Sequence, residues 1–216
     1  MSQARPEKLK ILVSSTVYGH EDLLDMIYAT LTSLGYDVLM SHSGTIQSFS
    51  KRSAFQDCLE AVAECDLFFS FITKSYGTGR DKRDKVSITH LELRKAIELE
   101  KPRWVLAHHD VVFARTLLRD LGYATPEQRL ALGKQLKKGA IIDDLRVIDM
   151  YEEATRSELE LDKRTGNWVQ KFRSDQEALL FAEAQFHRYQ EVERFVVEQL
   201  KDPSAIAAAI GKEGES

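Results

Sequence analysis

The continuous apolar run Asp66–Thr73 (DLFFSFIT) is the feature that most constrains the fold of this chain. A strand with one solvent-exposed face alternates apolar and polar residues, whereas this run is apolar almost throughout. Three similar runs occur at Leu9–Val13, Tyr36–Met40 and Arg103–Ala107. Strands that are apolar on both faces predict a parallel sheet covered by helices on two sides.

Amphipathic segments with helical spacing alternate with these runs. We expect helices over Gly19–Leu34, Ser53–Glu64 and Ser87–Glu100, the last with Ser87 as its N-cap. The alternation predicts an α/β fold, a flavodoxin-like three-layer sandwich whose central parallel sheet has the strand order 2-1-3-4-5.

The second half of the chain is less regular. Ala114–Leu121 and Pro126–Lys137 predict short helices, the latter capped by Thr125. Ile141–Met150 stays open, because LRVIDM could also form a strand. The charge-rich stretch Glu152–Gly166 predicts an exposed excursion.

A last strand and a last helix are expected near the C-terminus. Asn167–Phe172 fits the strand, and a capping box of Ser174 and Glu177 opens a helix with a broad apolar face that reaches about Leu200. We expect one domain over residues 1–210, with an elaborated C-terminal half. It divides into a core at 8–109, a helical insert at about 110–166 and the last strand and helix at 167–200, before a disordered tail at 211–216.

Composition excludes several classes of function. The net charge of −4 offers no basic patch for nucleic acid, and no apolar run approaches the roughly 20 residues that span a bilayer. No signal-peptide pattern precedes the first strand. Cys58 and Cys65 are seven residues apart on one predicted helix, beyond disulfide reach, so we expect reduced thiols and a cytoplasmic protein.

Polar residues follow each predicted strand at the same end. Ligands of open parallel sheets bind beyond the carboxyl ends of the strands. The candidate binding residues there are Ser14, Ser15, Thr16, Ser43, Thr73, Ser75, Tyr76, Gly77 and His108. The alternative is that loops are polar in any protein.

Glu92 occupies an unexpected position in the predicted helix that follows the third strand. Ile88, Glu92, Ala96 and Leu99 form one helical stripe, and Glu92 is its one charged member. Because this helix begins at the carboxyl edge of the sheet, its carboxylate could lie at the floor of a pocket, where burial raises the pKa. The alternative is that Glu92 pairs with Arg94 or Lys95, or reaches water at the edge of the stripe.

No metal or cofactor site is predicted. His108, His109 and Asp110 carry metal-ligand atoms, but adjacent residues of a strand point to opposite faces and cannot easily share one ion. His90 and Glu92 form H-x-E without the P-C-x-x-C partner of zinc deaminases. The charged loop Arg80–Lys85 is a candidate lid, although such a loop is more often simply solvated.

Three stretches between Lys8 and His109 resemble one known family. KLKILVSSTVYG, CLEAVAECDLFFSFITKSYG and SITHLELRKAIELEKPRWVLAH are similar to an uncharacterised TIR-like domain family, which is related to TIR domains and to nucleoside deoxyribosyltransferases. Its members often precede NACHT-type or repeat-bearing regions and occur in bacterial defence systems. The region Asp110–Gly166 is longer than a minimal TIR-like domain needs.

The resemblance implies an activity and roles for the candidate residues. Glu92 would act at an N-glycosidic bond, as the glutamate on the corresponding helix does in active TIR domains. Ser14, Ser15 and Thr16 would hold ribose or phosphate, while Tyr76 and His108 would contact the base or the sugar. NAD is then a substrate rather than a cofactor.

A second hypothesis is a non-enzymatic domain that senses a nucleotide or self-associates. The apolar face of the last helix is available for such a contact, although covering the sheet is the commoner use of such a face. Under either hypothesis the expected partners are a nucleotide or nucleoside, another copy or an effector protein, and neither nucleic acid nor a membrane. A receiver domain or a flavin carrier fits less well, because strand three ends in Thr73 rather than an aspartate and no flavin loop is found.

Overall fold

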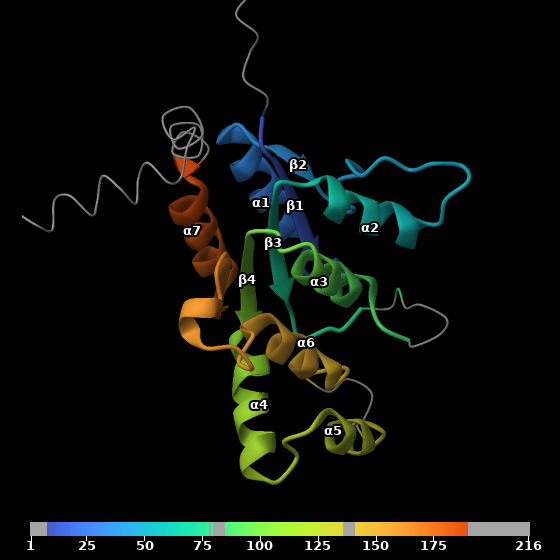
Figure 1. Ribbon diagram of the computed structural model, residues 1–216, viewed down its shortest axis with the longest axis vertical. Helices are drawn as coiled ribbons and strands as arrows, with labels where there is room; N and C mark the ends of the chain where they lie inside the picture. Colours follow the sequence, from blue (N-terminus) through green and yellow to red (C-terminus); the bar gives the residue numbers. More distant parts are fainter. Residues whose placement is uncertain (1–7, 78, 80–84, 136–140, 190–216) are drawn as a thin grey trace, which may run out of the picture.

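Five parallel strands form the centre of the computed structural model, which describes residues 8–77, 79, 85–135 and 141–189 (Figure 1). The strands are β1 (Lys10–Ser15), β2 (Asp37–Leu39), β3 (Leu67–Ile72), β4 (Arg103–His108) and β5 (Asn167–Phe172). Their order is β2-β1-β3-β4-β5, and every neighbouring pair is parallel. The predicted α/β class and strand order are confirmed.

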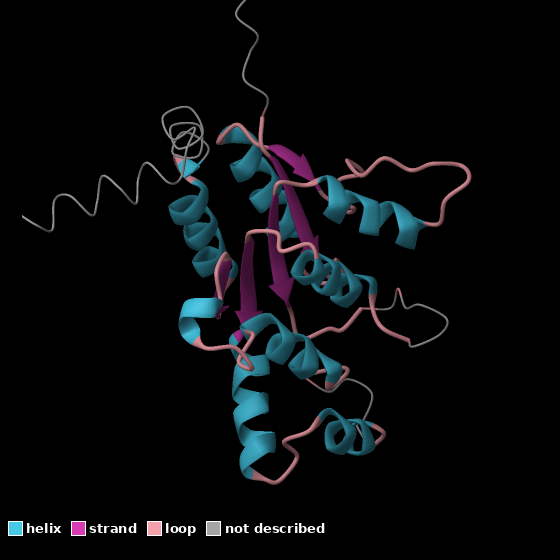
Figure 2. Ribbon diagram, viewed as in Figure 1, coloured by secondary structure: helices cyan, strands magenta, loops and turns pink. Residues whose placement is uncertain are grey.

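Helices cover the sheet on both faces (Figure 2). On one face α1 (Glu21–Ser33) and α7 (Asp175–Phe186) share a hydrophobic core with the strands. On the other face α2 (Ala54–Glu64), α3 (Ile88–Glu98) and α6 (Arg146–Thr155) share a second core. The result is the expected three-layer arrangement.

The central strand β3 explains why its sequence is apolar throughout. All six of its residues are buried. Phe69 and Phe71 belong to the core under α1 and α7, whereas Phe68 and Ile72 belong to the core under α2 and α3. A period of two residues therefore serves two cores at once.

The second half contains the main corrections. LRVIDM does not form a strand: Val147, Ile148 and Ala154 lie at helical spacing on α6 and are buried against the sheet. The charge-rich stretch Glu152–Gly166 begins inside this helix, and only its later part forms an excursion with the short 3-10 helix η1 (Leu161–Lys163).

Two further helices extend beyond the carboxyl ends of the strands (Figure 1). α4 (His109–Asp120) starts five residues before the predicted Ala114, and α5 (Pro126–Gly133) has the expected Thr125 cap. Because α4 follows β4 without a loop, His109 and Asp110 are helical residues and not strand residues.

The last helix is shorter than expected. α7 ends at Phe186, since His187 has extended backbone angles, and residues 190–200 of the expected helix lie outside the described residues. Ser174 caps α7, but the Glu177 carboxylate accepts a hydrogen bond from the Arg173 N–H rather than from Ser174, so the full capping box is absent at this end.

Three further expectations concern the cysteines, membrane-spanning helices, and the candidate lid and tail. Cys58 and Cys65 are free thiols. Across the described part of the chain, no helix is both long and apolar enough to cross a bilayer. The candidate lid residues 80–84 and the tail 211–216 lie outside the described residues.

Candidate functional site

Glu92 lies in the second turn of α3 and is buried, with 5% of its surface exposed. The Ser14 hydroxyl at the end of β1 donates a hydrogen bond to Glu92 Oε2 at 2.5 Å. The two alternative partners are engaged elsewhere, because Arg94 pairs with Glu153 and Lys95 with Glu98. The carboxyl therefore faces the strand ends and not the helix surface.

The environment of Glu92 favours its neutral form. Burial raises the pKa of this carboxyl to about 7, while hydrogen bonds from Ser14 and from the Cys58 thiol on α2 lower it. Burial and the neighbouring Glu92 raise the pKa of Cys58 to about 12, so Cys58 is a thiol that donates a hydrogen bond rather than a thiolate. A carboxyl that titrates near neutral pH is typical of catalytic sites, although buried structural networks share this property.

A small cavity of about 140 Å³ opens at the carboxyl ends of β1 and β3, next to Ser14. Most of its lining residues carry a hydroxyl or are glycines, although the surface that they expose to the cavity is more apolar than polar. The lining consists of Ser15, Thr16, Val17, Tyr18, Ser41, Gly77, Gly79, Ser87, Ile88 and Thr89. Of the predicted site residues, Ser15, Thr16 and Gly77 line it directly. Glu92 does not line this cavity, but lies behind it, against Ser14.

Two other predicted residues, Thr73 and Ser75, do not line the cavity but form hydrogen bonds next to it. The Ser75 carbonyl accepts hydrogen bonds from Thr16 Oγ1 at 3.0 Å and from Thr73 Oγ1 at 3.1 Å. The Thr16 bond ties the loop after β3 to the loop after β1, and the Thr73 bond lies within the loop after β3. Gly77 follows with a φ of +90°, a conformation that favours glycine.

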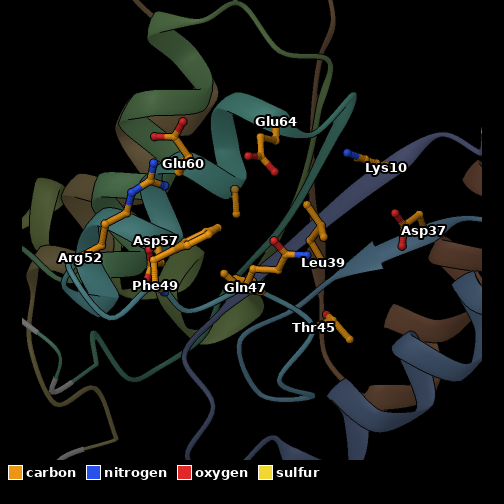
Figure 3. A pocket seen from close by; sticks show the side chains of 12 residues that line it. Lys10, Asp37, Leu39, Thr45, Gln47, Phe49, Arg52, Asp57, Glu60 and Glu64 are labelled. Atoms are coloured by element: carbon orange, nitrogen blue, oxygen red, sulfur yellow. Dashed lines mark hydrogen bonds between the residues drawn. The ribbon is translucent and has the colours of Figure 1, made fainter.

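Ser43, a predicted binding residue, lies outside the cavity, and Ser41 lines the cavity instead. The Ser43 hydroxyl contacts the Met40 sulfur in the turn after β2, whereas Ser41 lines the cavity. A separate and larger groove of about 310 Å³ lies between α2 and β2 (Figure 3) and includes none of the predicted site residues.

Tyr76 is a buried residue and does not line the cavity. Its hydroxyl hydrogen-bonds His90 Nδ1 at 2.8 Å, and His90 Nε2 lies 3.1 Å from Glu153. Burial acts to raise the pKa of Glu153, but hydrogen bonds from Arg94 and His90 outweigh it and lower the pKa to about 2. These contacts join α3 to α6 and hold the helix that carries Glu92.

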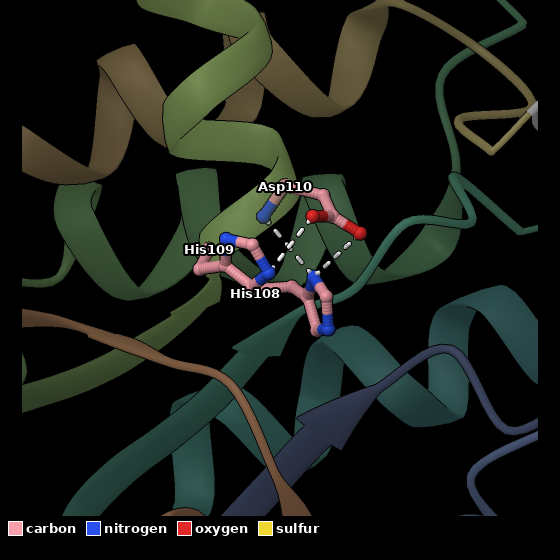
Figure 4. A group of neighbouring side chains, drawn as sticks. All are labelled: His108, His109 and Asp110. Carbon is pink, nitrogen blue, oxygen red and sulfur yellow. Dashed lines mark hydrogen bonds and ion pairs between the residues drawn. The ribbon is translucent and has the colours of Figure 1, made fainter.

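His108 belongs to a different group of side chains (Figure 4). His109 Nε2 lies 2.9 Å from Asp110 Oδ1, His108 Nδ1 lies 3.5 Å from Asp110 Oδ2, and one ligand atom from each residue lies within 4.8 Å of the others. The expectation that these side chains point to opposite faces of a strand is wrong, because the chain turns from strand to helix between His108 and His109.

The surroundings of this group disfavour a metal cation. Lys74 Nζ lies 3.9 Å from Asp110 Oδ2, and His108 Nδ1 accepts a hydrogen bond from the Asp110 N–H as the cap of α4. The start of a helix also carries partial positive charge. Burial lowers the pKa of His108, which is consistent with a neutral capping imidazole.

Sequence reasoning did not assign Cys58, Ser41 and Thr89 to the site. Ser41 was visible in the polar run after the second strand, and Thr89 follows the N-cap of the helix that carries Glu92. Nothing in the sequence places Cys58 beside Glu92, because that contact depends on how α2 packs against α3.

Comparison with known proteins identifies the family. Residues 10–201 match the family model described as "Domain of unknown function (DUF4062)". The chain belongs to this family. No curated protein matches this DUF4062 chain. Among solved structures, one similar chain is a conserved protein from Enterococcus faecalis V583, with 11% identity, a TM-score of 0.42 and coverage of 83% of this chain and 99% of that one.

Proposed function

We propose that this DUF4062 chain is a TIR-like domain that cleaves, or transfers a group at, the N-glycosidic bond of NAD or a related nucleotide. One observation carries the proposal: a buried carboxyl with a pKa near 7, held by Ser14 beside a cavity at the switch point of a parallel sheet. The resemblance of the segments around Ser14 and Glu92 to TIR-like domains suggests the bond that is attacked. It also suggests a role in bacterial defence signalling.

The carboxylate form of Glu92 would act at the anomeric carbon of the ribose. As the bond from that carbon to the nicotinamide nitrogen breaks, the electron pair stays with nicotinamide, which leaves as a neutral base. Glu92 then stabilises the positive charge on the sugar or forms a bond to it, and water or a second acceptor completes the reaction.

The cavity suits the sugar part of such a substrate. Its volume of about 140 Å³ is below the roughly 300–1,000 Å³ of typical ligand pockets. The cavity formed by the described residues therefore has room for only a fragment of the substrate, such as one ribose ring. Ser41 offers a hydroxyl to the sugar, and the Ser15 and Thr16 hydroxyls, whose hydrogens are donated to backbone carbonyls, can accept hydrogen bonds from it. In this proposal the substrate replaces the Ser14 hydroxyl as the partner of Glu92.

Chromatographic product analysis tests the proposal. Concentrated protein is incubated with NAD and, separately, with deoxynucleosides, beside the variants Glu92→Gln and Glu98→Gln. Glu98 is an exposed glutamate on the same helix and serves as the matched control. We expect nicotinamide or free base from the wild type and Glu98→Gln, and at least 100-fold less from Glu92→Gln.

Two results would count against the proposal. Product formation by Glu92→Gln at the wild-type rate would remove Glu92 from the chemistry. An absence of product with every substrate, from protein that circular dichroism shows to be folded, would favour the second candidate.

The second candidate is a sensing or assembly domain, and one surface favours it. Phe113 and Leu117 on α4 and Leu121 directly after it are 64%, 46% and 62% exposed, and they lie four residues apart on one helical stripe. An exposed apolar stripe of this kind is typical of protein contacts. The last helix, which the sequence suggested for this role, instead packs its buried face on α1 and the sheet.

A further inference from the structure

Figure 3 shows the groove between α2 and the edge strand β2. None of its lining residues lines the cavity near Glu92. At about 310 Å³ it is also the larger of the two. Its lining contains four acidic side chains and two basic ones, a formal excess of two negative charges. This balance favours a cationic ligand.

The acidic side chains are concentrated on one face of α2. Asp57, Glu60 and Glu64 lie three and four residues apart, so they share one side of the helix. Glu60 and Glu64 are exposed, whereas Asp57 is 5% exposed. The groove thus has an acidic rim and a buried carboxylate deeper inside.

Asp57 is the unusual member of the three. Its Oδ2 accepts a hydrogen bond from the Phe49 N–H at 3.3 Å, whereas Oδ1 is buried with no hydrogen-bond partner among the described residues. A buried polar atom without a partner costs free energy, and such atoms are rare in folded proteins. A ligand ammonium group would supply both the donor and the charge.

The rest of the lining favours an organic cation over a metal ion. The Arg52 guanidinium lies 4.8 Å from the centroid of the half-exposed Phe49 ring, so this ring already holds one cation, and a ligand ammonium group would displace Arg52 from it. Leu39, Ile46 and Ala61 add apolar surface to the same groove. Hard metal ions prefer six or more oxygen ligands and gain nothing from such a surface, whereas methylene groups do.

We propose that this groove binds an aliphatic diamine or polyamine. One ammonium group interacts with Asp57 and Phe49, the methylene chain lies on Leu39 and Ile46, and a second ammonium group reaches the rim at Glu64. This site is independent of the function proposed for Glu92.

Isothermal titration calorimetry in 150 mM NaCl tests the proposal with putrescine, spermidine and, as an inorganic divalent cation, MgCl₂. We expect saturable one-to-one binding of spermidine or putrescine by the wild type, at least 10-fold weaker binding by Asp57→Asn, and unchanged binding by Glu98→Gln. Glu98→Gln removes the same charge from an exposed site outside the groove.

Several outcomes would overturn the proposal. These are an absence of saturable binding, equal binding by Asp57→Asn and Glu98→Gln, or Mg²⁺ binding of similar affinity that competes with spermidine. If Asp57→Asn does not fold, Glu64→Gln at the exposed rim replaces it. At least threefold weaker binding by Glu64→Gln is then expected, and unchanged binding would contradict the proposal.

Discussion

Glu92 and its two hydrogen-bond donors show how one residue acquires unusual chemistry. The carboxyl comes from α3, the Ser14 hydroxyl from β1 and the Cys58 thiol from α2. Neither donor carries a full charge, so burial dominates and the pKa rises. Two predictions follow at this scale, one for the acid and one for the thiol.

The stability of the wild type should fall with increasing pH relative to Glu92→Gln. The pKa of Glu92 is raised from 4.5 to about 7 on folding, so between these values the folded protein binds more protons than the unfolded chain. At about 1.4 kcal/mol per pKa unit, the free energy of unfolding of the wild type should drop by roughly 2–3 kcal/mol relative to the variant between pH 5 and pH 8. Urea denaturation at several pH values measures this difference, and parallel curves would refute the raised pKa.

The cysteines should react slowly with alkylating reagents. Burial is the main cause that raises the pKa of Cys58 to about 12 and of Cys65 to about 11, and thiolates are the reactive form. Iodoacetamide at pH 8 should modify the native protein at least 10-fold more slowly than urea-unfolded protein, as followed by mass spectrometry. Modification of Cys58 at equal rates in both states would contradict its burial beside Glu92.

At the scale of elements, sequence periodicity predicted the strands and the helices up to β4 because each has one dominant apolar pattern. It left LRVIDM open because a short apolar run fits a strand or a buried helix equally well. It could place Glu92 on the correct face of α3, but not the Cys58 contact, which depends on the packing of α2 on α3. The convergence of His108, His109 and Asp110 was missed because it depends on where β4 ends.

Arg129 on α5 is expected to fix α5 against α6. Its guanidinium is buried and contacts both Asp149 and Glu152 at 2.6 Å. Arg129→Ala should lower the free energy of unfolding by about 3 kcal/mol, because it leaves two carboxylates without their shared partner. Arg119→Ala, which removes a surface pair with Asp120, is the matched control and should change it by less than about 0.5 kcal/mol. Thermal or urea unfolding compares the two, and equal losses would show that the buried contact is unimportant.

At the scale of the whole molecule, the sheet separates two hydrophobic cores and leaves α4 and α5 beyond its carboxyl end (Figure 1). The alternation of elements along the chain predicted a parallel sheet covered on both faces, and the order 2-1-3-4-5 is one of the common orders of such a sheet. The exposed stripe on α4 could not be predicted, because its apolar residues resemble those of a helix packed on the core. Only the position of α4 beyond the sheet leaves them in water.

Self-association through the exposed stripe on α4 can be tested separately. If Phe113, Leu117 and Leu121 form a contact between copies, sedimentation velocity should show a concentration-dependent increase in mass. Leu117→Lys should abolish this increase. The control variant Leu180→Lys, at an exposed residue of α7, should leave the increase unchanged. A monomer at all concentrations, or equal effects of both variants, would remove the stripe as a self-association surface.

The most direct test of the central claim is the pH dependence of kcat/KM for nicotinamide release from NAD by the wild type and Glu92→Gln. Because the carboxylate is the form that acts and its pKa lies near 7, wild-type kcat/KM should rise with pH and level off above about pH 7. Glu92→Gln should be at least 100-fold slower than the wild type at the plateau. A wild-type rate that is flat from pH 5 to 9, or activity retained in Glu92→Gln, would contradict the account.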